Sequence, residues 1–103
     1  MEKITIVIIE ALQQTIGLSD PKTQKLFYKQ KEFMELNPNY PSLGRTKLKN
    51  VCDKYGMPLW EIRLDSKKRI VFVERDNGLV IWLKICGHDE LIRKNIIIIK
   101  DNY

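Results

Sequence analysis

The chain has 103 residues, of which 44% are hydrophobic and 30% are charged, and this composition is typical of one folded domain spanning residues 1–103. With 5 glycines and 4 prolines, it is neither collagen-like nor of low complexity. Its 18 lysines and arginines against 13 acidic residues leave a net charge of +5, which favours a polyanionic partner, either nucleic acid or an acidic protein.

The cysteine and histidine content argues against a structural zinc site. Cys52 and Cys86 lie outside any CxxC spacing and His88 is the one histidine of the sequence, whereas structural zinc usually takes four Cys or His ligands. No apolar run approaches the ~20 residues that span a bilayer. The apolar run before Glu10 is too short for a signal peptide. We therefore expect a cytoplasmic protein with two free thiols, no metal or other cofactor, and no membrane partner.

The N-terminal part of the chain predicts one strand and two helices. Residues 4–8 are a β-branched run typical of a short strand, and residues 9–17 follow with helical spacing up to a glycine. A second helix begins at Asp20-Pro21, because Asp20 can cap free N–H groups and Pro21 suits the first turn, and it runs to Leu36. Its expected apolar side is Leu26, Phe27, Phe33, Met34 and Leu36, and its expected polar side is mainly Lys22, Lys25, Lys29, Gln30 and Glu32.

The segment of residues 43–58 is the least regular part of the sequence. Leu48, Val51, Cys52 and Tyr55 recur at helical spacing, which predicts a short helix ending at Gly56. A loop is the alternative.

The C-terminal part alternates with a period of two and predicts three strands, over residues 59–64, 69–75 and 79–86. Short turns join them, and the Asn77-Gly78 pair is a strong hairpin signal. We therefore expect an α+β fold, in which the N-terminal strand and two helices pack on one face of an antiparallel β-meander. Residues 96–99 are either a last strand or a segment buried by a partner.

Strand alternation assigns the charged side chains to one face of this sheet. Four apolar residues of the last meander strand are expected to face the helices: Leu79, Ile81, Leu83 and Ile85. Arg63, Arg69 and Lys84 then project from the uncovered face, with Trp82 among them as an aromatic floor. Phosphate and a stacked base would both fit such a surface. The alternative is a solvated face whose cations prevent edge aggregation.

His88 follows the last meander strand in the segment Gly87-His88-Asp89-Glu90. Its imidazole suits proton transfer near neutral pH, and Asp89 or Glu90 could orient it; the alternative is a surface histidine that caps a turn. The sequence has no Gly-rich phosphate loop and no visible cluster of carboxylates. Any phosphoryl chemistry is therefore expected to be metal-free.

Taken in order, these segments resemble the RelE/ParE superfamily of toxin–antitoxin toxins, especially its RelE and YafQ-like mRNA-cleaving branch. The resemblance covers roughly residues 4–93. It rests on five segments: Asn37-Pro38-Asn39-Tyr40-Pro41-Ser42-Leu43, Lys47-Leu48-Lys49, Trp60-Glu61-Ile62-Arg63, Arg69-Ile70-Val71-Phe72, and Leu83-Lys84-Ile85-Cys86-Gly87-His88-Asp89-Glu90.

The resemblance implies a RelE-like fold and a ribosome-dependent, metal-independent mRNA endoribonuclease that inhibits translation and is held inactive by a cognate antitoxin. In such toxins the RNA 2′-OH attacks the adjacent phosphate and leaves a 2′,3′-cyclic phosphate. By position, His88 matches the proton-transferring histidine, Arg63 and Arg69 match positions lining the active face, and Lys84 falls where several members have arginine. The expected RNA-binding residues are Lys47, Lys49, Trp82 and Asp89.

Two positions depart from the family pattern. Ile92 stands where relatives often carry an aromatic ring that stacks on a base, and Lys84 lacks the bidentate fork of arginine. Two other functions stay open: a non-enzymatic ParE-like gyrase poison, and a catalytically inactive member that acts as a protein-binding module. We also expect the isoleucine-rich residues 95–100 to be paired within the sheet or covered by a partner, because an exposed strand of this kind aggregates.

Overall fold

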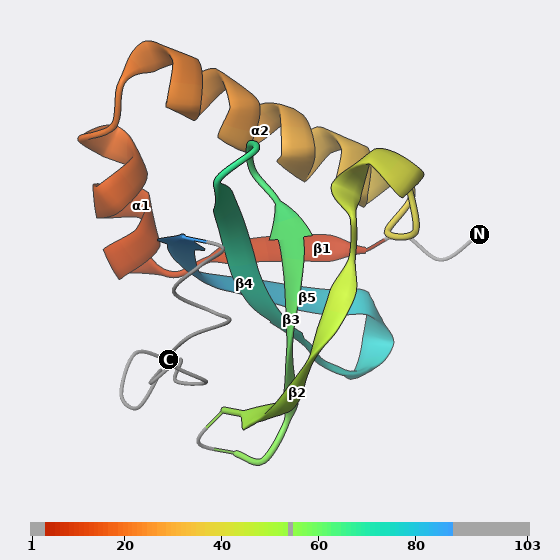
Figure 1. Cartoon of the computed structure of the whole chain (residues 1–103). Coiled ribbons are helices and arrows are strands. Elements are labelled where there is room, and N and C mark those ends of the chain that lie inside the picture. The colour runs from red at the N-terminus through yellow and green to blue at the C-terminus, as the bar shows by residue number, and fades with distance from the viewer. Residues whose placement is uncertain (1–3, 54, 88–103) are drawn as a thin grey trace.

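The structure is a computed structural model, which describes residues 4–53 and 55–87 (Figure 1). Within these residues, five strands form one sheet in the order β1-β5-β4-β3-β2, and both helices pack on one of its faces, which confirms the predicted α+β fold. The main elements are β1 (Thr5–Ile8), α1 (Glu10–Gly17), α2 (Pro21–Leu36), β2 (Thr46–Cys52), β3 (Pro58–Arg63), β4 (Lys68–Glu74) and β5 (Leu79–Gly87). Strands β2 to β5 form an antiparallel meander, and β1 lies parallel to β5 at the sheet edge.

The start of α2 follows from its first residues, as predicted. The Asp20 carboxylate accepts a hydrogen bond from the backbone N–H of Thr23 at 2.7 Å, and Pro21 occupies the first turn. The same hydrogen bond lowers the pKa of Asp20 below its usual value. Asp20 is therefore the N-cap of α2 and Pro21 its first residue, as predicted.

The core lies between α2 and the sheet face that the helices cover, called here the helix side. Phe27 and Met34 of α2 are fully buried, and the Phe27 ring meets the Trp82 ring edge-on, with centroids 5.1 Å apart. Two predictions about α2 are wrong. Leu36 is 76% exposed, because it lies in the last turn beyond the core, and Gln30 is 9% exposed and belongs to the buried side.

The prediction for residues 43–58 is also wrong, for the helix and for the loop alternative. The segment contains the edge strand β2, preceded by a short 3-10 helix, η1 (Pro41–Leu43). Thr46 lies opposite Glu61 and Cys52 lies opposite Pro58, with a shift of register between the two pairs. This irregularity breaks the strict alternation of a strand, and the spacing of the apolar residues therefore resembles that of a helix.

A β-bulge in β5 overturns the predicted orientation of its apolar residues. Val71 of β4 pairs with Lys84 and the next residue, Phe72, pairs with Trp82, which leaves Leu83 as the extra residue. The alternation changes phase at this point, since directly paired residues share a face. Of the four residues expected on the helix side, Ile85 alone pairs with a residue of that side, whereas Leu79 and Ile81 turn to the other face.

The turn before β5 and both cysteines lie within the described residues, whereas the predicted last strand does not. The turn at Asn77-Gly78 is confirmed as a 3-10 turn, η2 (Asp76–Gly78), in which Gly78 has a φ of 74°. Cys52 and Cys86 are both free thiols. The strand predicted for residues 96–99, and its partner-covered alternative for residues 95–100, lie outside the described residues.

Candidate functional site

Three of the predicted site residues lie on the sheet face opposite the helices, called here the outer face. Arg63 of β3 pairs with Arg69 of β4, and Lys84 of β5 pairs with Val71, two residues from Arg69. Because neighbouring strands are about 4.8 Å apart and diagonal neighbours about 7–8 Å, Arg69 has a cation on each side within reach of a long side chain. The prediction that these three cations share one face is confirmed. By register, this face comprises Leu59, Glu61, Arg63, Arg69, Val71, Val73, Ile81, Lys84 and Cys86.

Arg69 is held in place by the turn between β3 and β4. Its Nη1 donates hydrogen bonds to the backbone carbonyls of Asp65 at 2.9 Å and Lys68 at 3.0 Å. The Asp65 carboxylate in turn accepts hydrogen bonds from the backbone N–H groups of Lys67 and Lys68, both at 2.7 Å. Within the described chain, Nη2 and Nε of Arg69 make no hydrogen bond, and a bound anion could use them.

The Asp65 carboxylate stays ionised in this turn. Although partial burial opposes ionisation, the two backbone hydrogen bonds and the nearby charges of Lys68 and Arg69 lower the pKa of Asp65 below its usual value. The turn therefore fixes the Arg69 guanidinium through carbonyl groups and keeps one negative charge beside it.

Arg63 is exposed; α2 contacts its backbone, and the loop before β2 contacts its side chain. Its carbonyl accepts a hydrogen bond from Gln30 Nε2 of α2. Its guanidinium lies over Gly44, where an added Cβ would come within 3.6 Å of Nη2. Gly44 has a φ of 60°, a conformation that favours glycine, and it therefore sets the path of the loop that the Arg63 guanidinium contacts.

Lys84 is exposed on the outer face and shares a row of the sheet with Glu61. Val71 lies between them and is fully buried, and Glu61 itself is 8% exposed. Two strand spacings of about 4.8 Å separate Glu61 from Lys84, so the two charges are near each other across the sheet without being direct neighbours. Glu61 was expected on the same face as Arg63 but was not predicted as a site residue, because alternation alone does not distinguish it from a solvated charge.

The structure does not bring every predicted site residue to this face. Trp82 is 0% exposed beneath Phe27, so the expected aromatic floor is wrong: the bulge at Leu83 turns the indole ring into the core. Lys47 is exposed but pairs with Trp60, on the helix side of the sheet. Lys49 lies in β2, and the placement of its side chain is not described.

His88 and Asp89 lie outside the described residues, and their predicted roles are not tested. The described chain ends at Gly87, which pairs with Lys68 at the start of β4. Arg69 is the next residue along β4.

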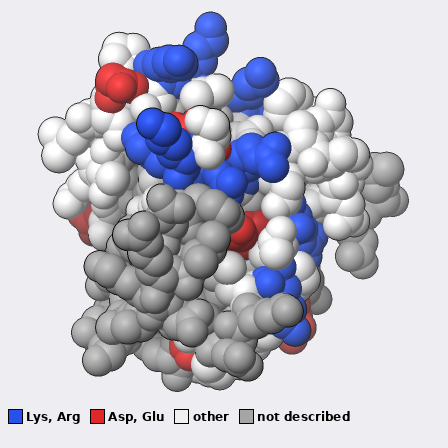
Figure 2. Space-filling view, in the orientation of Figure 1, with Lys and Arg blue, Asp and Glu red and all other residues white. Residues whose placement is uncertain are grey.

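Positive charge gathers at that end of the sheet. Figure 2 shows lysine and arginine side chains over α2 and over the β3–β4 turn, with few acidic side chains between them. Lys68 acts electrostatically on both Asp20 and Asp65, and Lys22 acts on Asp20, which shows that the turn and the start of α2 are close in space. An anionic strand crossing this end of the sheet would meet cations from three elements.

Arg45, which was not singled out from the sequence, ties the loop before β2 to the sheet. Its guanidinium lies 4.4 Å from the centre of the Trp60 ring and forms an ion pair with Glu74. Its Nη1 also donates to Asn39 Oδ1 at 3.4 Å. Arg45 therefore fixes the segment that contains Gly44, although no local pattern marks it out.

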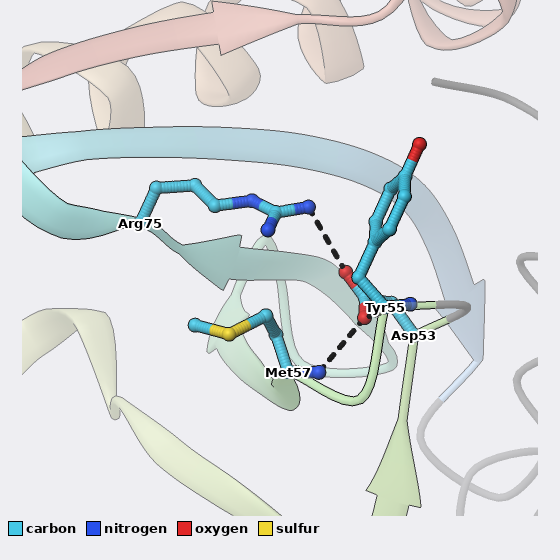
Figure 3. A network of polar contacts seen from close by, with 4 residues as sticks. All are labelled: Asp53, Tyr55, Met57 and Arg75. Carbon is cyan, nitrogen blue, oxygen red and sulfur yellow. Dashed lines mark hydrogen bonds and ion pairs between the residues drawn. The ribbon is translucent and has the colours of Figure 1, made fainter.

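A second polar network stabilises the opposite end of the sheet (Figure 3). The buried Asp53 carboxylate accepts hydrogen bonds from the backbone N–H groups of Tyr55 at 2.8 Å and Met57 at 2.9 Å, and it pairs with Arg75 Nη2 at 3.5 Å. The Arg75 guanidinium also lies 4.9 Å from the centre of the Tyr55 ring. This network joins the β2–β3 turn to the end of β4, far from the arginines of the outer face.

The described residues point to neither a metal site nor a membrane span. No group of three or more His, Cys, Asp and Glu side chains among them is placed to hold a metal ion. Neither described helix is long and apolar enough to cross a bilayer.

Comparisons with known proteins support the fold through structure alone. No family model matches the chain, and no curated protein matches its sequence. Among solved structures, the archaeal RelE–RelB complex from Pyrococcus horikoshii OT3 matches with a TM-score of 0.66 and 16% identity, over 84% of this chain and 96% of that one.

Two further toxin structures resemble the chain. The YoeB/ParE toxin from Agrobacterium tumefaciens gives a TM-score of 0.60 at 9% identity, over 82% of this chain and 99% of that one. A mutant of the E. coli toxin RelE in the free state gives 0.57 at 16% identity, over 82% of each chain. The fold is therefore RelE-like, and the resemblance to the RelE/ParE superfamily is confirmed at the level of fold.

Proposed function

We propose that this chain is the toxin of a toxin–antitoxin pair and that it cleaves mRNA on the ribosome. The observation that carries the proposal is the position of Arg63, Arg69 and Lys84 on one face of a RelE-like fold. When an RNA 2′-OH attacks the adjacent phosphate, the pentavalent transition state gains negative charge, and cations held beside it stabilise that charge. In the proposed reaction, the side chains of Arg63, Arg69 and Lys84 supply this positive charge.

Each residue has a distinct proposed role. Arg69 presents Nη2 and Nε to the phosphate oxygens from a position fixed by the β3–β4 turn, and Arg63 donates from the neighbouring strand. Lys84 contributes a point charge without the arginine fork. His88, the residue after Gly87, transfers the proton of the 2′-OH or of the leaving 5′-oxygen.

The remaining proposed RNA contacts are Lys47 and Lys49 of β2, together with Asp89 beside the histidine. Lys47 would hold mRNA or ribosomal RNA away from the reacting phosphate, because it lies on the helix side of the sheet. Trp82 has no part in this proposal, since its ring is fully buried.

The proposed regulator is a cognate antitoxin protein that acts in the cytoplasm. One structural neighbour is itself a RelE–RelB complex, which supports a partner of this kind. An acidic segment laid over the outer face would neutralise the cations proposed to bind phosphate, and the net charge of +5 favours such a partner.

Expression of the chain in bacteria tests the proposal. We expect translation to stop and ribosome-bound mRNA to carry new ends with a 2′,3′-cyclic phosphate. Arg69→Ala should lower the cleavage rate by about 10²- to 10³-fold, the range for losing one donor to a developing oxyanion, and Arg69→Lys should restore part of it. Lys25→Ala, which removes one exposed cation of α2, is the matched control and should cleave at the parent rate.

Two outcomes would overturn the proposal. If the double variant Arg69→Ala with His88→Ala arrests growth as the parent does, the assigned roles are wrong. If the parent induces a DNA-damage response while its mRNA stays intact, the chain acts as a gyrase poison of the ParE kind.

A further inference from the structure

A stack of two aromatic rings, of which Phe33 is partly buried and Tyr40 is exposed, joins α2 to the loop that follows it. The rings of Phe33 and Tyr40 are stacked with an interplanar angle of 7° and centroids 5.0 Å apart. Lys29, one helical turn before Phe33, places its Nζ 5.6 Å from the centre of the Phe33 ring. Tyr40 ends this stack and is 39% exposed, and among the described residues no other ring or cation lies against it.

The backbone at Tyr40 is held by hydrogen bonds, and its ring by the stack with Phe33, before any ligand arrives. The backbone N–H of Tyr40 donates to the carbonyl of Asn37 at 3.0 Å, and the Tyr40 carbonyl accepts from the N–H of Leu43 at 3.0 Å. The Asn37 side chain accepts a further hydrogen bond from Asn39 N–H at 3.0 Å, and Pro41 restricts the backbone on the other side. A ring fixed in this way loses little conformational freedom on binding.

We propose that the free side of the Tyr40 ring is a stacking platform for one unpaired base of a single-stranded RNA. Every base has a π-face, so an aromatic ring beside cations binds RNA without sequence preference. Lys29 supplies a cation beside the Phe33 ring of the stack. The proposal rests on the proposed function, to which it adds an RNA contact outside the reacting centre.

The platform is structurally continuous with the outer face. The segment that carries Tyr40 leads through η1 to Gly44, and Gly44 lies under the Arg63 guanidinium. Gln30, in the helix turn beside Phe33, holds the Arg63 carbonyl. The loop that carries Tyr40 and the helix before it therefore both contact Arg63.

RNA fits this surface better than an apolar peptide. The platform is one flat ring with a polar hydroxyl edge, it follows the polar residue Asn39 in the chain, and Lys29 lies over the ring on which it stacks. A peptide that buries apolar side chains would instead depend on Leu36, which is 76% exposed at the end of α2. The two occupants therefore predict different sensitive residues.

The test measures binding of two labelled oligonucleotides of about twelve nucleotides, a length within the range covered by single-strand binding modules. One is a 2′-O-methyl RNA, which has no 2′-OH to react, and the other is an abasic strand with the same number of phosphates. Tyr40→Ala should weaken binding of the RNA by roughly 5- to 100-fold and leave binding of the abasic strand unchanged. Tyr40→Phe should retain binding within about twofold, since the ring alone stacks.

Two controls separate stacking from charge and from general surface effects. Tyr28→Ala removes another half-exposed tyrosine of α2, which has no parallel ring stack, and should leave both affinities unchanged. Lys29→Ala should weaken both oligonucleotides and reduce the dependence of the affinity on salt, whereas Tyr40→Ala should leave that dependence as it is.

The proposal is overturned if Tyr40→Ala affects both oligonucleotides equally or neither, or if Leu36→Ala weakens RNA binding as much as Tyr40→Ala does. Should Tyr40→Ala fail to fold, Tyr40→Leu keeps an apolar contact with Phe33 without a π-face and serves in its place. Arg69→Ala should retain the Tyr40-dependent difference between the two strands. If Tyr40-dependent RNA binding is found but the protein does not cut mRNA, the proposed function is wrong and the platform proposal stands.

Discussion

Gln30, in the middle of α2, donates a hydrogen bond to the backbone carbonyl of Arg63, 33 positions later in the chain. The side chain is nearly buried, so this amide connects the helix layer to the end of the strand that carries one of the site cations. A polar residue in the packed face of a helix needs such a partner, because burying its amide without one is unfavourable.

Gln30→Leu should lower the free energy of unfolding by about 1–3 kcal/mol, because the Arg63 carbonyl loses its donor while the packing volume is kept. Urea denaturation measures the change. Gln13→Leu is the matched control: Gln13 is exposed and also donates to a carbonyl, that of Ile8 at 2.7 Å. Water can replace that donor, so the control should lose no more than about 1 kcal/mol. Equal losses in the two variants would show that the hydrogen bond to the Arg63 carbonyl contributes no more to the free energy of unfolding than an exposed one.

Gly44→Ala should destabilise the protein by about 1–2 kcal/mol, because its φ of 60° is unfavourable for a residue with a Cβ. The added methyl group would meet the Arg63 guanidinium at ordinary contact distance, so the loss comes from the backbone. Gly44→Asn should lose less, since asparagine tolerates this conformation. Gly17→Ala, at the end of α1 with open space around it, should be neutral or stabilising in the same thermal unfolding series.

Acid should destabilise the fold through Asp20 and Asp65, whose pKa values are both lowered in the folded chain. A carboxylate with a lowered folded pKa stabilises the protein above its unfolded pKa of about 3.9, and the contribution disappears as the pH falls through the folded pKa. Chemical denaturation between pH 6 and about pH 2.5 should therefore show falling stability. In Asp20→Asn the slope should be smaller, because the amide still caps the helix but does not titrate; an unchanged slope would contradict this assignment.

Asp53→Ala should lower the free energy of unfolding by about 2–4 kcal/mol, because Arg75 and two backbone N–H groups lose a buried acceptor. Lys31→Ala, which breaks the exposed pair with Glu35, should change stability by no more than about 0.5 kcal/mol. Neither site belongs to the outer face. Loss of mRNA cleavage in an Asp53→Ala protein that remains fully folded would contradict a purely structural role.

The elements whose signals are local could be predicted from the sequence. Asp20-Pro21 marked the start of α2, and the alternation of residues 59–64 and 69–75 marked β3 and β4. The shared face of Arg63 and Arg69 followed from that alternation, since both strands are regular where they pair. The regular periodicity of the sequence was thus sufficient to predict most of the fold and the face on which the site cations lie.

The features that depend on contacts between distant segments could not be predicted. The edge strand β2 lacks a regular register, and the bulge at Leu83 becomes visible only when β5 is paired with β4. Gln30 looks like a surface residue until the Arg63 carbonyl is brought to it. The stack of Phe33 on Tyr40 likewise depends on how the loop folds back. In each case the deciding partner lies on another element of the fold.

The single extra residue in β5 has a consequence for how this strand can vary. In a regular strand, Trp82 and Lys84 would point to the same face of the sheet, because they are two positions apart. A substitution that suited Trp82 in the core would then also alter the surroundings of Lys84. The bulge separates them, so that Trp82 lies against Phe27 while Lys84 faces solvent. Substitutions that refit the interior around Trp82 and substitutions that retune the charge at Lys84 can therefore accumulate independently of one another.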